Sequence, residues 1–253
     1  MLTENQKQRY LRNIILPEIE ELGQEKLLRA KVLVVGAGGL GSPVLLYLAA
    51  GGVGNIGLID DDVVELSNLQ RQVIHNSQNL GQKKVESAKE KIFALNSDVN
   101  LTIYPQRANR ETLREISANY DFVLDCTDNF PTRFIINEIC FEQKKPLIFA
   151  AVKGFLGQVS VFKAYENNNP CYACFNQNIV DESFALPLSE KGILGSVAGT
   201  VGALQATTTI KEILGIGQEE KNSLVGKILI FDFLKNEFRK VGLKKNCGCK
   251  VCR

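Results

Sequence analysis

Short apolar runs alternate with longer amphipathic stretches along about the first 150 residues of the chain. Lys31–Gly36 is a continuous β-branched run that ends in glycine, which is typical of a strand buried on both faces. Gly81–Asn96 repeats its apolar residues along one stripe, which predicts a helix. Further strands are predicted at Asn55–Asp60, Val99–Tyr104, Tyr120–Cys126 and Pro146–Val152, and further helices at Leu40–Ala50, Arg110–Ala118 and Pro131–Gln143. This alternation indicates right-handed βαβ units and an α/β fold with a doubly wound, mainly parallel, Rossmann-like sheet.

The pattern changes after about residue 155. Strands of a small antiparallel C-terminal section are predicted at Leu156–Lys163, Gly226–Phe233 and Glu237–Val241. Between them lies Ile193–Leu204, which is rich in Gly, Ala, Ser and Thr and is too short and too polar to span a bilayer. We expect a helix there whose backbone packs closely against a neighbouring element at Gly195, Gly199 and Gly202.

Composition limits the classes of function. Of the 253 residues, 45% are hydrophobic and 23% charged, which fits a globular protein and excludes a disordered chain, a fibre or a disulfide-stapled scaffold. The net charge of +2 gives no indication of nucleic-acid binding. The one histidine, His75, excludes metal sites built mainly from imidazoles, and we assign it no role. Because the N-terminus lacks the apolar stretch of a signal peptide, we expect a cytoplasmic protein without a membrane segment, with reduced or metal-bound cysteines.

A glycine-rich turn follows the first predicted strand and opens a helix, with glycines at Gly36, Gly38, Gly39 and Gly41. Such glycines permit a tight turn and let backbone N–H groups approach a phosphate, which a helix N-terminus favours. Asp60 ends the second predicted strand, where a carboxylate accepts hydrogen bonds from ribose hydroxyls. The context favours nucleotide binding over simple strand–helix packing, but this pattern alone fits a nicotinamide dinucleotide as well as ATP.

Positively charged side chains are predicted at the same edge of the sheet. Asn68 and Arg71 fall in the loop after the second strand, at the carboxyl side where ligands of such folds bind. Lys83 and Lys84 fall in the first turn of a predicted helix, where cations are mildly unfavourable for the helix dipole. Cations at that end indicate a nearby anion, with solvated lysines as the ordinary alternative.

A second carboxylate follows the fourth predicted strand. Asp125 and Asp128 emerge at the same edge, and either Asp128 or Asn129 could simply cap the next helix. Mg²⁺ prefers one or two carboxylates plus phosphate oxygens. The cations together with Asp128 therefore favour ATP over NAD, which carries less phosphate charge.

Four cysteines form two C-x-x-C pairs that are far apart in the sequence: Cys171, Cys174, Cys249 and Cys252. Four thiolates in two such pairs predict a closed, structural tetrahedral zinc site. A single pair could be a redox pair, and Cys247 offers an extra thiol within reach of the second pair. Cys126 and Cys140 fall in apolar elements and are predicted to be core residues.

Taken in order, several motifs resemble those of the ThiF/MoeB/HesA family of ubiquitin-activating-enzyme-like adenylyltransferases. The matching segments are GAGGLGS, LIDDDVVELSNLQRQ, GQKKVESA, DCTDNFPTR, GFLGQVSVF and the paired C-x-x-C. The resemblance runs from about Arg9 to the C-terminus and implies one ThiF-type domain over residues 1–253. That domain would comprise an N-terminal helical segment (1–30), a nucleotide-binding core (31–155) and a carrier-binding and zinc section (156–253).

The resemblance also implies roles for individual residues. The four glycines would hold ATP, Asp60 its ribose, and Asp128 a magnesium ion. The phosphates would be contacted by Asn68, Arg71 and Lys84, and by Arg12 from the neighbouring subunit of a homodimer. The four paired cysteines would bind zinc.

The implied reaction is ATP- and Mg-dependent adenylation of the C-terminal glycine of a ubiquitin-like sulfur carrier, for thiamine (ThiS-like) or molybdopterin (MoaD-like) biosynthesis. The carrier supplies the attacking carboxylate, so the enzyme's cations would mainly bring two anions together. One departure is that Phe175–Leu194 contains no cysteine, which disfavours a covalent intermediate on that loop. Sulfur would come from a separate donor protein. The alternatives are an NAD-dependent oxidoreductase and a non-catalytic, zinc-stabilised binding protein.

Overall fold

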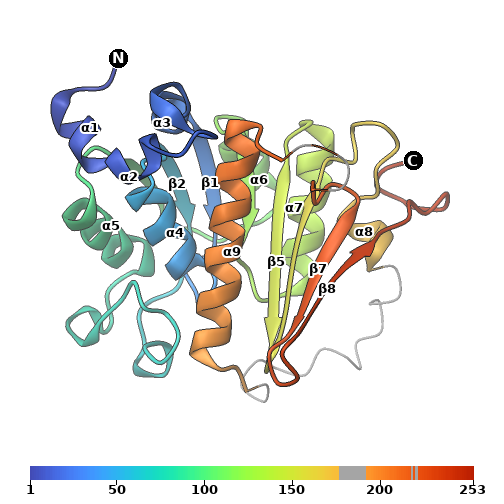
Figure 1. Ribbon diagram of the computed structural model, residues 1–253. Coiled ribbons are helices and arrows are strands. Elements are labelled where there is room, and N and C mark those ends of the chain that lie inside the picture. Colours follow the sequence, from blue (N-terminus) through green and yellow to red (C-terminus); the bar gives the residue numbers. More distant parts are fainter. Residues whose placement is uncertain (177–191, 218, 220–221) are drawn as a thin grey trace.

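A computed structural model describes residues 1–176, 192–217, 219 and 222–253. In this part of the chain one eight-stranded sheet has the order β3-β2-β1-β4-β5-β6-β7-β8 (Figure 1). The strands are β1 (Lys31–Val35), β2 (Asn55–Ile59), β3 (Asn100–Tyr104), β4 (Phe122–Asp125), β5 (Leu147–Lys153), β6 (Leu156–Phe162), β7 (Lys227–Asp232) and β8 (Glu237–Gly242). The helices are α1 (Glu4–Arg9), α2 (Leu11–Ile14), α3 (Glu20–Arg29), α4 (Gly41–Ala50), α5 (Lys84–Leu95), α6 (Arg110–Ser117), α7 (Phe130–Glu142), α8 (Tyr172–Phe175) and α9 (Gly195–Leu214). The predicted α/β fold is confirmed.

Strands β1 to β5 are parallel, and their carboxyl ends meet at one edge. β1 lies at the centre of this half, with Val32 opposite Ile56 of β2 and opposite Phe122 of β4. The chain continues from β1 to β2 on one side and returns to β4 on the other. This reversal makes the carboxyl edge of β1 and β4 the switch point at which ligands of doubly wound sheets bind.

Strands β6 to β8 form the predicted small antiparallel section and extend the same sheet. β5 and β6 form an antiparallel hairpin, and β6 pairs in turn with β7, and β7 with β8. Gly154 has a φ of +58° and lies in the tight β5–β6 turn. The strand directions were predicted correctly. That this section continues the sheet was not predicted, because the continuity depends on the long-range pairing of β6 with residues 68 to 76 positions later, such as Leu156 with Asp232.

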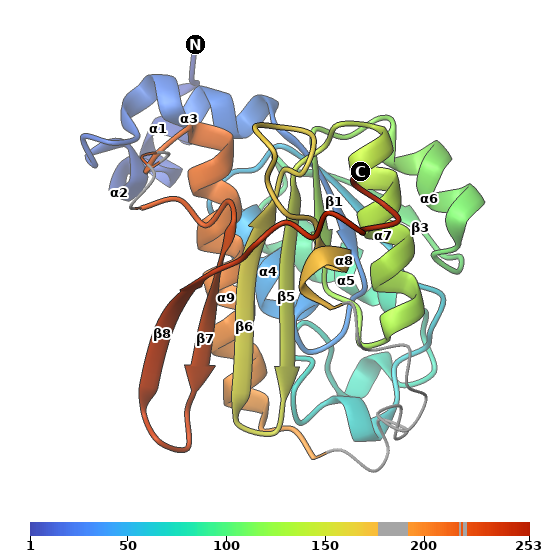
Figure 2. The same ribbon diagram turned by 90° about the vertical axis from the view of Figure 1, so that its right-hand side faces the viewer.

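Helices cover both faces of the parallel half and bury two apolar cores (Figures 1 and 2). One core joins the sheet to α3, α4, α5 and α9, and the other joins it to α6, α7 and α8. Fully buried strand residues such as Val34 and Leu33 point to opposite faces, as the period of two requires. The sheet is therefore held rigidly from both sides beneath its carboxyl edge.

The N-terminal helices α1 to α3 pack at the opposite edge, where the strands begin. Thr3 caps α1 by accepting from the Gln6 amide, and the Gln6 side chain accepts from the Thr3 amide in return. Tyr10 is buried, and its hydroxyl accepts a hydrogen bond from Asn96 at the end of α5 (2.9 Å). The predicted helical character of this segment is confirmed.

The glycine-rich helix, α9, is longer than the run that predicted it and packs closely at two of the three glycines named. A side chain at Gly195 would overlap the Gln70 carbonyl oxygen, and one at Gly202 would lie 2.6 Å from the Leu40 carbonyl oxygen. Gly199 faces open space, so the prediction of close packing is wrong there. Within the described ranges, no helix is long and apolar enough to cross a membrane.

Candidate functional site

The loop Gly36–Gly41, called the glycine loop below, joins β1 to α4 at the switch point. Gly36 has a φ of +101°, and a Cβ there would lie 2.9 Å from the Cys126 carbonyl oxygen. A Cβ on Gly41 would overlap the carbonyl oxygen of Gly36. These two positions accept only glycine: at Gly36 both the backbone angle and the space exclude a side chain, and at Gly41 the space alone does. Gly38 and Gly39 are less constrained.

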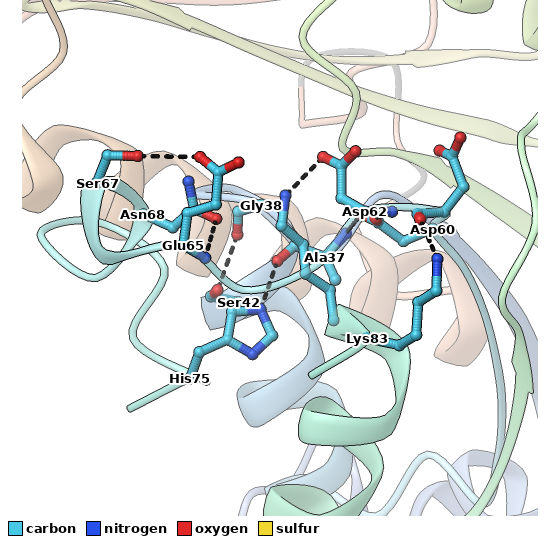
Figure 3. Close-up of polar contacts among 12 residues, drawn as sticks. Ala37, Gly38, Ser42, Asp60, Asp62, Glu65, Ser67, Asn68, His75 and Lys83 are labelled. Atoms are coloured by element: carbon cyan, nitrogen blue, oxygen red, sulfur yellow. Dashed lines mark hydrogen bonds and ion pairs between the residues drawn. The ribbon is translucent and has the colours of Figure 1, made fainter. Parts of the chain in front are cut away.

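Asp60 fixes the glycine loop from the end of β2. Its Oδ2 accepts a hydrogen bond from the Ala37 amide (2.8 Å), and its Oδ1 accepts from the Asp62 amide (2.9 Å) (Figure 3). Burial raises the pKa of Asp60, and the Ala37 hydrogen bond opposes that shift. The carboxylate predicted to contact ribose is therefore held in one orientation beside the loop.

His75 supports the glycine loop from below, a position that the sequence did not indicate. Its Nε2 lies 3.2 Å from the Ala37 carbonyl oxygen (Figure 3). Its Nδ1 lies 2.8 Å from the Ser87 hydroxyl. Because a carbonyl only accepts, Nε2 carries the proton and Nδ1 accepts from Ser87. Burial lowers the pKa of His75, and the nearby Lys84 charge adds to this effect. The neutral imidazole therefore supports the glycine loop at the Ala37 carbonyl. Its partners are too distant in sequence to be recognised from a motif.

Two of the predicted cations border the glycine loop. The Arg71 side chain lies 3.4 Å from the position that a Cβ on Gly39 would occupy, and its guanidinium donates to the Ser67 carbonyl (3.0 Å). Lys84 is buried, with its Nζ 2.7 Å from Asp62 Oδ2. Lys83 differs from Lys84: its ammonium donates to the Asp61 carbonyl (2.8 Å). α5 begins at Lys84, so the cation is at the helix N-terminus as predicted.

Asn68 and Gln72 lie on either side of Arg71 in the chain. Asn68 is buried at the end of a short 3₁₀ helix, Leu66–Asn68, and its Oδ1 accepts from the Glu65 amide (3.2 Å). Gln72 is buried, and its Nε2 lies 3.8 Å from the position of a Cβ on Gly38. Among the described residues, Gln72 Oε1 is one of a few buried side-chain atoms without a hydrogen-bond partner. Gln72 lies within the motif that drew attention to Arg71, but its residue type gave no reason to select it.

The segment Asp125–Asn129, called the acidic turn below, follows β4. Asp125 is buried, and its Oδ1 accepts from both the amide (2.9 Å) and the hydroxyl (2.6 Å) of Thr127. Asn129 caps α7 by accepting from the Thr132 amide (3.0 Å). Asp128 is exposed. Of the two candidates for the cap, Asn129 takes that role and leaves the Asp128 carboxylate at the edge of the sheet.

Gln205 of α9 holds the base of the acidic turn. It is fully buried and donates from Nε2 to the carbonyl oxygens of Asp125 (2.9 Å) and Ile148 (3.0 Å). Its Oε1 accepts from the Cys126 thiol (3.4 Å), whose pKa burial raises well above the ordinary value. One amide thereby joins the carboxyl end of β4 to the amino-terminal part of β5. Gln205 ends the apolar run in the sequence, and nothing there indicated this role.

Arg12 lies away from the other predicted site residues of its own chain. It is exposed on α2, whose Asn13 donates to the Gly51 carbonyl at the C-terminal end of α4 (3.4 Å). The glycine loop is at the other end of this ten-residue helix, about 15 Å along its axis at 1.5 Å per residue. The structure therefore brings together the glycines, Asp60, Asn68, Arg71 and Lys84, but not Arg12.

The four paired cysteines form one buried cluster at the far end of the chain from the glycine loop. The sulfur–sulfur distances are 3.9 Å for Cys171–Cys174, 3.6 Å for Cys171–Cys249 and 3.3 Å for Cys174–Cys252. All four ligand atoms lie within 4.8 Å of one another. These separations exclude disulfides and are close to the edge of about 3.8 Å that Zn–S bonds of about 2.3 Å give to a tetrahedron. The donor set and spacing therefore fit zinc.

The remaining cysteines follow the sequence interpretation. Cys126 and Cys140 are buried core residues, as predicted, and Cys247 is exposed. The expectation about the cysteine-free loop Phe175–Leu194 concerns mainly residues 177–191, which lie outside the described residues.

The fold and the site define a doubly wound α/β protein with a nucleotide-type glycine loop and a four-cysteine cluster. Residues 10–251 match the ThiF family, so the chain belongs to the ThiF family. It is an adenylyltransferase, the enzyme class that the names of its curated relatives share.

Relatives in three organisms illustrate the range of the family. The chain is 41% identical to a sulfur carrier protein adenylyltransferase of Thermus thermophilus, over 99% of this chain and 92% of that protein. It is 39% identical to the SAMP-activating enzyme E1 of Haloferax volcanii, over 99% and 90%. The adenylyltransferase and sulfurtransferase MOCS3 of Culex quinquefasciatus is 41% identical over 99% of this chain, which spans only 56% of MOCS3.

Solved structures agree with this assignment. The crystal structure of E. coli MccB with AMPCPP and MccA superposes with a TM-score of 0.83 at 25% identity, covering 98% of this chain and 75% of that one. A structure of E. coli MccB with ATP gives a TM-score of 0.82 at 25% identity, over 96% of this chain and 74% of that one.

Proposed function

We propose that this chain binds ATP with Mg²⁺ at the carboxyl edge of β1, β2 and β4 and adenylates the C-terminal glycine of a ubiquitin-like sulfur carrier protein. The carrier is ThiS-like or MoaD-like, so the product serves thiamine or molybdopterin biosynthesis. One observation carries the proposal: a glycine loop, a fixed carboxylate and two cations meet at one sheet edge in a chain 41% identical to a sulfur carrier protein adenylyltransferase.

The glycine loop and Asp60 bind the nucleotide in this proposal. No side chain caps the N-terminus of α4 at Leu40, and the helix dipole favours phosphate oxygens at that end. Each Asp60 oxygen accepts one backbone hydrogen bond and retains a further lone pair for a ribose hydroxyl. The same residues would suit NAD, and the cations distinguish the two nucleotides.

Arg71, Lys84 and Asn68 surround the triphosphate. Arg71 and Lys84 supply positive charge at a partly dry edge, where it is worth more than in water. Lys84 already pairs with Asp62, so a phosphate competes with that carboxylate for the ammonium. Asn68 is held by its Oδ1, which directs its amide nitrogen as a donor.

Asp128 holds magnesium in this proposal. Mg²⁺ neutralises phosphate charge when bound and takes few protein ligands, so one exposed carboxylate beside the phosphates fits its preference. The carboxylate is positioned by its neighbours in the chain, because Thr127 is bonded to Asp125 and Asn129 caps α7.

The reaction needs no nucleophile from the enzyme. A carboxylate oxygen of the carrier's last glycine forms a bond to the α-phosphorus. The bond from that phosphorus to the bridging oxygen of the β-phosphate breaks, and pyrophosphate leaves with the electron pair. The α-carboxyl group is ionised at neutral pH, so no proton has to be removed from it. Arg71 and Lys84 lower the repulsion between the two anions and stabilise charge that develops on the phosphate oxygens.

A homodimer completes the site in this proposal. Arg12 is exposed near the start of the strands, so it reaches a triphosphate only on a second copy of the chain. Zinc in the four-cysteine cluster serves as a structural ion with no open coordination position. A separate protein supplies sulfur to the adenylated carrier.

Carrier-dependent exchange of labelled pyrophosphate into ATP tests the proposal. We expect exchange with a carrier that ends in Gly-Gly and none with the same carrier lacking its last glycine. Asp128→Ala should lower the exchange rate about 100-fold, since it removes charge stabilisation at the phosphates. Asp98→Ala, an exposed aspartate near the end of α5, is the matched control and should retain full activity.

Other outcomes point to the alternatives. Saturable NADH binding without ATP binding would favour an oxidoreductase. Carrier binding without pyrophosphate exchange would favour a zinc-stabilised binding protein. Full activity in Asp128→Ala would contradict the magnesium assignment.

A further inference from the structure

Tyr172 lies between Cys171 and Cys174 of the cluster and is buried among aromatic side chains. Its ring centroid lies 5.0 Å from that of Phe149 and 5.4 Å from that of Phe134. Its amide donates to Asn137 Oδ1 of α7 (2.9 Å). The segment Cys171–Cys174, called the first knuckle below, is therefore anchored through Tyr172 to β5 and α7.

Arg133, in the second turn of α7, contacts the same aromatic group from the other side. Its guanidinium carbon lies 5.5 Å from the Phe149 ring centroid and 5.8 Å from that of Phe130. Such cation–π contacts fix the guanidinium where it is shielded from water. Burial raises the pKa of Tyr172 to about 12, and the Arg133 charge, together with a side-chain hydrogen bond, opposes that shift. The Phe149 ring contacts both Arg133 and Tyr172, and this shared ring links Arg133 to the first knuckle.

The same guanidinium holds the acidic turn. Arg133 Nη2 donates to the Thr127 carbonyl oxygen (2.7 Å), and its Nε lies 3.7 Å from Asp125 Oδ2. Thr127 is therefore bonded on its amide, hydroxyl and carbonyl groups, the first two by Asp125. The next residue is Asp128. Its backbone position follows from the Thr127 carbonyl, and that carbonyl is held by Arg133.

We propose that Tyr172 and Arg133 are positioning residues that couple the four-cysteine cluster to the acidic turn. An ordered cluster fixes Tyr172, Tyr172 and Phe149 fix the guanidinium, and the guanidinium fixes the peptide that carries Asp128. The inference deepens the proposed function, because it makes the affinity of the Asp128 site for a divalent cation depend on the cluster. Neither residue touches nucleotide or metal.

Metal binding in Tyr172→Phe and Arg133→Lys tests this coupling. Mn²⁺ is the probe for the magnesium site, and its binding to the protein with ATP is read by electron paramagnetic resonance. Because each variant loses one hydrogen bond to a charged group, we expect Mn²⁺ to bind about tenfold more weakly. ATP affinity without a divalent cation should not change. Zinc content and the urea unfolding midpoint establish that each variant is folded.

Tyr120→Phe is the matched control. Tyr120 is also buried, and its hydroxyl pairs with that of Tyr104 (3.0 Å) at the opposite end of β4 from the acidic turn. The Tyr120→Phe variant loses a buried tyrosine hydroxyl but keeps the contacts among Tyr172, Phe149 and Arg133. It should therefore bind Mn²⁺ as the unsubstituted protein does. Equal Mn²⁺ affinity in Tyr172→Phe and in this control would overturn the coupling.

Amide hydrogen exchange tests the link independently of the reaction. Removal of zinc by a chelator should accelerate exchange about tenfold in residues 125–130 and leave residues 36–41 unchanged. In Tyr172→Phe, residues 125–130 should exchange fast even with zinc bound. If only residues 171–175 respond to zinc removal, the coupling is wrong whether or not the protein adenylates a carrier. If the acidic turn responds but neither Mn²⁺ nor ATP binds, the coupling holds and the proposed function fails.

Discussion

The two turns that end β1 and β4 lie at the same edge of the sheet but are held in different ways. The glycine loop is fixed by absent side chains, a backbone hydrogen bond to Asp60 and the neutral imidazole of His75. The acidic turn is fixed by side chains that come from other elements, with Arg133 of α7 and Gln205 of α9 bonded to its carbonyls. The first turn therefore depends mainly on the absence of side chains within it, whereas the second depends mainly on side chains of α7 and α9.

This difference has a physical consequence for the site. The glycine loop keeps its shape as long as its glycines are intact, because a side chain at Gly36 or Gly41 would clash with the backbone packed against it. The acidic turn contains a buried pair, Asp125 and Arg133, in which losing either partner leaves an uncompensated charge. We expect the glycine loop to be sensitive to changes within it, and the acidic turn to changes at a distance.

Gly36→Ala should have the largest effect. The φ of +101° and the Cys126 carbonyl oxygen at 2.9 Å both oppose a side chain at Gly36. We expect the free energy of unfolding to fall by about 3 kcal/mol and ATP affinity to fall at least tenfold. Urea unfolding and calorimetric titration with ATP measure the two quantities.

Gly199→Ala is the control for this substitution. Gly199 lies within α9 and faces open space, so alanine should raise the free energy of unfolding by about 1 kcal/mol through helix propensity. Equal stability of the two variants would show that the shape of the glycine loop is not fixed by steric exclusion.

Zinc removal should have a smaller effect, at a site distant from the glycine loop. At free zinc a hundred times its dissociation constant, binding stabilises the fold by about 2.7 kcal/mol, and that stabilisation is lost on chelation. We expect about one zinc per chain, loss of it in Cys252→Ser, and retention in Cys247→Ser, whose thiol is exposed. Metal analysis and urea unfolding with and without a chelator measure this. Freshly purified reduced protein without metal would contradict the assignment.

The same comparison explains what the sequence could predict. The parallel strands, the glycine loop and Asp60 are visible in sequence because periodicity, glycine and a strand-end carboxylate are local signals. The spacing within the two C-x-x-C pairs also predicts a metal site, and the structure brings all four cysteines together. The glycine loop and each cysteine pair were therefore recognisable from residues a few positions apart.

The supports of the acidic turn and of the glycine loop were missed for the opposite reason. Gln205 and Asp125 are 80 positions apart, and His75 and Ala37 are 38 apart. In the sequence, a glutamine at the end of an apolar run or a histidine in a polar stretch looks the same whether its side chain is solvated or bonded to a buried carbonyl. Their roles depend on which backbone carbonyl lies opposite, and only the assembled sheet determines that.

The smallest expected effect concerns His75 and the pH dependence of stability. Burial and the nearby Lys84 charge lower the pKa of His75 below its ordinary value of 6.5. Below pH 6.5 the unfolded chain therefore binds a proton that the folded chain does not, and stability falls as pH decreases until the folded pKa is reached. The contribution is fully present above pH 6.5. One proton changes the free energy of unfolding by at most about 1.4 kcal/mol per pH unit.

His75→Gln isolates this contribution, because glutamine keeps a donor for the Ala37 carbonyl and does not titrate. Urea unfolding should show that the stability advantage of the unsubstituted protein over His75→Gln decreases, or reverses, as the pH falls below 6.5. Asp60 and Asp125 have raised pKa values in both proteins, so their titration cancels in the comparison. A constant difference across this range would mean that the imidazole accepts a proton as readily in the folded chain as in the unfolded one. The glycine loop would then rest on a charged group, and the contrast with the acidic turn would be lost.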